Sequence, residues 1–117
     1  AQHARRLLDE LRSPRLKIVI DPANLFHPAD LPRMDEIMDE AFDLLGGDIA
    51  IAHAKELGAD AHAGSLPLGT GVLDWPRYLS LLKTAQFKGP LIMHGVEEQD
   101  VAASVKFLRD AMASAAL

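Results

Sequence analysis

The chain has 117 residues, of which 49% are hydrophobic and 25% are charged, and its formal net charge at pH 7 is −5. This composition is typical of a soluble globular domain. No apolar run approaches the roughly 18–20 residues that a membrane span needs, and the first residues lack the apolar core of a signal peptide. We therefore expect a cytoplasmic protein without a membrane span. The acidic balance with scattered lysines and arginines disfavours a nucleic-acid partner, and the lack of cysteine excludes disulfides and thiolate metal sites.

The first half of the chain predicts a helix, a strand and a second helix. Residues 2–12 place apolar side chains at helical spacing, and residues 16–20 form a short apolar run that ends at Asp21. After a loop with two prolines, Asp30 is the expected N-cap of a second helix that continues to Leu45.

The second half repeats this order twice. Residues 49–52 predict a strand that ends at His53, and a long loop rich in glycine and alanine follows it. Such loops are uncommon in compact domains and are often functional. Asp74 is the expected N-cap of a third helix. The two glycines just before it, Gly69 and Gly71, are better explained by relief of backbone crowding than by phosphate binding.

A third strand over residues 91–93 ends at His94, and the last helix is expected over residues 98–113. Strands that alternate with helices indicate a parallel sheet, and short apolar strands without polar alternation indicate that both faces are covered. We therefore expect one α/β domain over residues 1–117, with parallel strands and helices on one side.

Each predicted strand ends on a side chain that can bind a metal or transfer a proton: Asp21, His53 and His94. In parallel α/β folds, the carboxyl ends of the strands meet at one edge, where active sites lie. Carboxylate and imidazole donors suit Mn, Co, Zn or Fe better than an all-oxygen Mg or Ca cage. Each residue alone also has a structural interpretation: an Asx turn at Asp21, a hydrogen-bonded imidazole at His53, or a loop position at His94.

Four segments in register resemble the sugar isomerase/epimerase family, which shares the xylose isomerase-like barrel: IVIDPANL, IAHAKE, LPLGTGVLDWPRYLSLL and FKGPLIMHG. The resemblance runs from about residue 2 to residue 113. It implies the C-terminal three βα units of a (β/α)8 TIM barrel, which means a partial barrel. A complete barrel typically needs about 250 residues and eight strands.

The resemblance also implies site residues. Asp21 and His53 match the metal-binding Asp and His of the family, and a divalent metal (Mn, Co, Zn or Mg) is implied as the cofactor. His94 stands where the family has a glutamate, so His94 is a candidate both for metal binding and for catalytic proton transfer. The implied substrate-binding residues are three, namely Asn24, which replaces a family His, and Lys55 and Glu56.

The resemblance therefore implies part of a metal-dependent sugar or sugar phosphate isomerase or epimerase that acts by proton transfer next to a carbonyl. Two alternatives stay open: a non-catalytic fragment or assembly module, and an AP-endonuclease-like phosphodiesterase. We expect the chain alone to be inactive, because it offers too few ligands and an open cavity. We also expect it to form a homo-oligomer or to pair with a missing N-terminal part, because open sheet edges recruit other strands.

Overall fold

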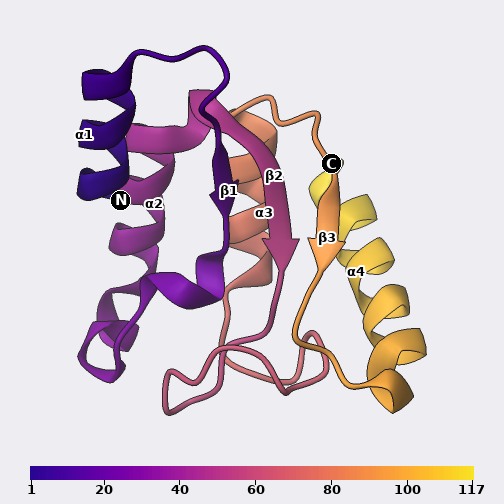
Figure 1. The fold of residues 1–117 in the computed structure, drawn as a ribbon. Coiled ribbons are helices and arrows are strands. Elements are labelled where there is room, and N and C mark those ends of the chain that lie inside the picture. Colours follow the sequence, from indigo (N-terminus) through magenta and orange to yellow (C-terminus); the bar gives the residue numbers. More distant parts are fainter.

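A computed structural model describes residues 1–117 as four α-helices around a three-stranded sheet (Figure 1). The helices are α1 (Gln2–Leu11), α2 (Met34–Leu45), α3 (Trp75–Thr84) and α4 (Val101–Ala115). The strands are β1 (Ile18–Ile20), β2 (Ile49–Ala54) and β3 (Leu91–Met93). They lie in the order β1-β2-β3, and both pairings are parallel. The expected alternation of helices with parallel strands is confirmed.

Only one face of the sheet is covered, so the expectation that both faces are covered is wrong for this chain, whereas the expectation of helices on one side is confirmed. Figure 1 shows the helices behind and beside the sheet, with the front face free. Ile20, Ala52 and Ala54 point toward the helices and are at most 3% exposed, whereas Val19 is 51% and Ile92 is 42% exposed on the other face. This asymmetry is that of a barrel wall, which carries helices outside and turns its inner face toward the barrel centre.

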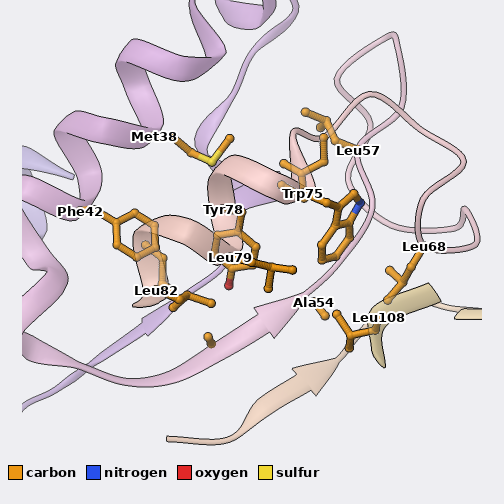
Figure 2. Packing of buried hydrophobic residues seen from close by; sticks show 14 of the residues in the cluster. Met38, Phe42, Ala54, Leu57, Leu68, Trp75, Tyr78, Leu79, Leu82 and Leu108 are labelled. Carbon is orange, nitrogen blue, oxygen red and sulfur yellow. The ribbon is translucent and has the colours of Figure 1, made fainter. Parts of the chain in front are cut away.

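The core lies between the sheet and the helices, and α3 is its central element (Figure 2). Tyr78 is fully buried and makes edge-to-face contacts with Phe42 of α2 and with Trp75, each at 6.1 Å between ring centroids. Trp75 also meets Phe107 of α4 at 5.5 Å. Aromatic pairs of this geometry contribute beyond the area that they bury, so α3 joins its two neighbouring helices.

The start of α3 is fixed as the sequence predicts. The Asp74 side chain accepts a hydrogen bond from the Arg77 backbone N–H at 2.9 Å. The Arg77 guanidinium in turn donates to Asp39 of α2, with 3.0 Å between Nε and Oδ1. Asp74 thus caps α3, and the Arg77 side chain links α3 to α2 on the outside of the fold.

The start of α2 differs from the prediction. Residues Pro28–Arg33 form a 3-10 helix, and α2 begins only at Met34. The Asp30 carboxylate accepts from the His27 backbone N–H at 2.9 Å, so Asp30 closes this 3-10 turn and does not cap α2. Two prolines remove backbone donors from the segment, which explains why the regular α-helix starts later.

Helix α1 is attached by polar contacts and by Leu8, which is buried. Arg5 donates to Asp48 at 2.8 Å and to the Leu44 carbonyl at 3.2 Å, and the hydrogen bond from Arg5 lowers the pKa of the Asp48 carboxyl. The apolar stripe that predicts this helix is only partly buried, since Leu7 and Leu11 are 49% and 59% exposed. The outer face of α1 is therefore bare in the same way as the inner face of the sheet.

Candidate metal site

The pleat of the three strands brings the candidate ligands to one rim. Val19 pairs with Ile51, and His53 pairs with Ile92, so these side chains share the inner face of the sheet. Side chains two positions apart in a strand lie on the same face. Asp21 follows Val19 by two residues, and His53 and His94 stand in the same relation to Ile51 and Ile92. In Figure 1 all three arrowheads point toward the loop after β2, where the rim lies.

Asp21, His53 and His94 converge closely. Each offers one ligand atom, and these atoms all lie within 4.8 Å of one another. His53 Nδ1 lies 3.2 Å from Asp21 Oδ2, and the two imidazole rings are stacked with 5.0 Å between centroids and 14° between planes. The arrangement contains one carboxylate and two imidazoles, a donor set that suits zinc-like ions.

The Asp21 carboxylate has an unused oxygen. Oδ1 is buried and has no hydrogen-bond partner, whereas Oδ2 faces His53 and Lys55. A buried polar atom without a partner is costly, and metal binding is one reason for a protein to keep one. The carboxylate accepts no backbone N–H, so the alternative of an Asx turn at Asp21 is wrong. The residues at the rim fit a divalent cation.

Asn24 and Lys55 lie beside the three candidate ligands. Lys55 Nζ is 3.4 Å from Asp21 Oδ2 and 3.5 Å from Asn24 Oδ1, and its side chain is only 11% exposed. The Lys55 ammonium group therefore lies next to the Asp21 carboxylate, and the aliphatic part of the Lys55 side chain packs against the loop. Contact of either residue with a substrate stays a prediction, but both side chains are at the rim where such contact requires them.

Glu56 does not reach the rim. It is 1% exposed, and its carboxylate accepts hydrogen bonds from the backbone N–H groups of Leu57, Gly69 and Leu73 and from Trp75 Nε1. A saturated and buried carboxylate has no oxygen to offer to a substrate. The sequence-based assignment of Glu56 to substrate binding is therefore replaced by a structural role inside the loop. The sequence already held a hint of this role, because Lys55 and Glu56 are neighbours in an extended segment, where successive side chains point to opposite sides.

This loop leaves no room at Gly71. A Cβ built there would lie 2.2 Å from the Leu57 carbonyl oxygen and 2.6 Å from Glu56 Oε1. We expect Gly71→Ala to lower the free energy of unfolding by about 1–3 kcal/mol, as overpacked sites do. Gly47→Ala is the matched control, because a Cβ at Gly47 meets nothing within 4 Å and the change should stay within about 0.5 kcal/mol. Urea denaturation measures both, and equal effects would contradict the prediction.

Tyr78 is a residue of the site that the sequence did not reveal. Its hydroxyl donates to the His53 carbonyl oxygen at 2.8 Å, which holds the end of β2 from behind. Burial raises the pKa of the Tyr78 phenol, and the nearby Asp21 charge raises it further. The phenol therefore stays protonated and keeps donating. In the sequence it is one member of an apolar helical stripe, which predicts burial but not this contact.

The largest grooves lie elsewhere, and each has a volume of about 400 Å³. One lies between α3 and α4, the other lies between the segment that joins α3 to β3 and the C-terminal end of the chain, and Lys83 lines both. The rim of the sheet is open, because three strands form a wall and not a closed cavity. None of the helices combines the length and the apolar character required to cross a bilayer.

Comparisons with known proteins agree with this architecture. The model of the xylose isomerase-like TIM barrel family matches residues 1–111. The solved structure of a xylose isomerase domain protein from Planctomyces limnophilus has a TM-score of 0.74 and 20% identity, and the match covers 98% of this chain but 44% of that one. No curated protein matches the chain. The chain therefore belongs to the xylose isomerase-like TIM barrel family, and its three βα units form part of such a barrel.

Proposed function

We propose that the chain supplies three of the eight βα units, and the corresponding part of the rim, of a divalent-metal-dependent sugar or sugar phosphate isomerase or epimerase. The observation that carries this proposal is that Asp21, His53 and His94 each place a ligand atom within 4.8 Å of the other two, while the second oxygen of the Asp21 carboxylate has no partner. The family supports the class of reaction. The remaining ligands and the closed cavity would come from strands outside this chain, since a complete barrel has eight.

Asp21, His53 and His94 would hold a metal ion such as Mn, Co, Zn or Mg. When bound, such an ion polarises a carbonyl oxygen and stabilises the negative charge that develops on it. Lys55, which faces both Asp21 and Asn24, would lend positive charge to the same side of the rim. Asn24 would orient a substrate hydroxyl through its amide.

His94 has two proposed roles that exclude each other at one nitrogen. A lone pair that binds a metal cannot at the same time accept a proton. As the base, His94 would take a proton from the carbon next to the carbonyl and leave an enediolate. In an isomerisation the proton would return to the former carbonyl carbon while the hydroxyl proton moves to the former carbonyl oxygen, and in an epimerisation a group from another strand would donate a proton to the opposite face of the same carbon. As a ligand, it would leave this transfer to a residue from another strand.

Metal titration of the full-length protein tests the proposal. We expect one Co or Zn ion to bind, and His53→Ala to lower the affinity by more than about 10-fold, since even supporting residues of metal sites cost that much. His94→Ala should match this loss if His94 is a ligand, and should leave the affinity unchanged while stopping turnover if His94 is the base.

His62→Ala is the matched control, because His62 lies in the loop after β2 and outside the three-residue group. Isothermal titration and the visible spectrum of bound Co report on the site without any activity assay. Aldose–ketose and epimer assays then define the reaction. A protein that binds no divalent ion, or whose affinity is equally insensitive to both rim histidines, would refute the proposed site.

The two rival functions have less support. A phosphodiester-cleaving enzyme needs a basic surface for nucleic acid, and the chain carries a net charge of −5. A non-catalytic assembly role would draw on the bare inner face, where Val19 and Ile92 are exposed. It leaves unexplained why a carboxylate and two imidazoles gather at one rim with their ligand atoms within 4.8 Å of one another.

A further inference from the structure

Glu56 is a buried carboxylate without a cation. Oε1 accepts from the N–H groups of Leu57 at 3.0 Å and Leu73 at 3.3 Å. Oε2 accepts from Gly69 N at 2.6 Å and from Trp75 Nε1 at 2.9 Å. One side chain thus gathers both ends of the loop between β2 and α3.

The gathered loop reaches the end of the neighbouring strand. Gly64 N donates to the Glu56 carbonyl oxygen at 2.8 Å, and Ser65 N donates to the Gly95 carbonyl oxygen at 2.7 Å. Gly64 and Gly95 have φ angles of 90° and 68°, which side chains rarely adopt. A Cβ built at Gly95 would lie 3.1 Å from the Gly64 Cα. The loop backbone therefore lies directly against the residue that follows His94.

Lys55 is held by the same contact. A Cβ built at Gly64 would lie 3.3 Å from the Lys55 Cε, and one built at Gly95 would lie 3.5 Å from it. The Lys55 stem therefore runs beside this glycine pair before its ammonium group reaches Asp21 at 3.4 Å. The glycine pair contacts one rim residue and is adjacent in the chain to another, His94.

From this chain of contacts we infer that Glu56 is a positioning residue of the candidate metal site. Its carboxylate folds the loop, the loop packs Gly64 against Gly95, and that contact fixes His94 and Lys55 at the rim. The inference rests on the proposed function for the identity of the site. This role differs from a general contribution to stability. It predicts that loss of the Glu56 carboxylate weakens metal binding more than an equally destabilising substitution elsewhere in the core.

Glu56→Gln in the full-length protein is the sharpest test. The amide keeps the shape of the side chain but turns an NH2 group toward two N–H donors, so only one oxygen still accepts. We expect the affinity for Co or Zn to fall by about 10-fold or more, as for other supporting residues of metal sites. The Ser65 amide proton is hydrogen-bonded to Gly95 and not to Glu56. Its rate of hydrogen exchange should nevertheless rise by about 10-fold.

Leu82→Ala is the matched control, because Leu82 is fully buried in α3 and lies outside the loop and the rim. It should lower the melting temperature at least as much as Glu56→Gln while leaving metal affinity and Ser65 exchange within about twofold of wild type. A Glu56→Gln protein that keeps wild-type affinity and exchange, or that loses no more than the control, would overturn the inference.

Two provisions keep the outcomes separate. If Glu56→Gln fails to fold, Trp75→Phe removes a single donor to the carboxylate, and a several-fold acceleration of Ser65 exchange is expected; unchanged exchange would overturn the inference. If the wild type binds no metal, the proposed function fails. The exchange measurement still tests whether Glu56 orders the loop against Gly95.

Discussion

Asp21→Ala is expected to reduce the proposed isomerase or epimerase turnover of the full-length protein by about 1000-fold or more. Asp21 is the one carboxylate in the three-residue group, and its Oδ1 has no partner in the protein. Electrophilic stabilisation by a metal contributes several kcal/mol to the transition state, and about 4 kcal/mol corresponds to a factor of about 1000. Progress curves with saturating metal measure the effect.

Thermal unfolding gives a second measurement for the same variant. A ligand at 100 times its dissociation constant stabilises the folded state by about 2.7 kcal/mol. The wild type should therefore melt at a higher temperature with added metal, and Asp21→Ala should not respond. Asp43→Ala, an exposed carboxylate on α2, should keep both turnover and the metal response. Retained turnover in Asp21→Ala would place the metal, or the chemistry, elsewhere.

Trp75→Ala is expected to lower the free energy of unfolding by about 3–5 kcal/mol, the usual cost of truncating a buried aromatic residue. Trp75 is 3% exposed, contacts Tyr78 and Phe107 and donates its indole N–H to Glu56. The substitution would thus leave a cavity and would also remove one donor to a buried carboxylate. Urea denaturation measures the loss.

Val101→Ala is the control for this truncation, because Val101 is 39% exposed at the start of α4. Its effect should stay within about 0.5 kcal/mol. Trp75→Phe should lie between the two, at about 1–2 kcal/mol, since it keeps one aromatic ring in the core and loses the hydrogen bond and the second ring. A Trp75→Ala protein as stable as the control would show that the core can collapse around the missing ring.

The candidate ligands were predictable because they depend on topology alone. Once alternating helices and apolar strands indicate a parallel sheet, the carboxyl ends of the strands must share one edge. Asp21, His53 and His94 follow from that rule without any knowledge of register. The close stacking of the two imidazoles was not predictable, since it depends on His53 pairing with Ile92 across the sheet.

The path of the long loop could not be predicted. Periodicity assigns helices and strands, but the loop after β2 has none, and its shape depends on where one carboxylate turns. Lys55 and Glu56 are neighbours in the sequence and point to opposite sides in the structure, one to the rim and the other inward. Similarly, Asp30 can cap a helix or close a 3-10 turn, and the two prolines around it decide for the turn.

Trp75 is the only tryptophan of the chain. Its indole N–H donates to the Glu56 carboxylate and its ring packs against Phe107, so we expect its fluorescence to report on both contacts. The protein therefore carries an intrinsic optical probe at the first residue of α3, directly after the loop that packs against the rim. Emission spectra and quenching by acrylamide can follow the ordering of this loop in real time, without a label.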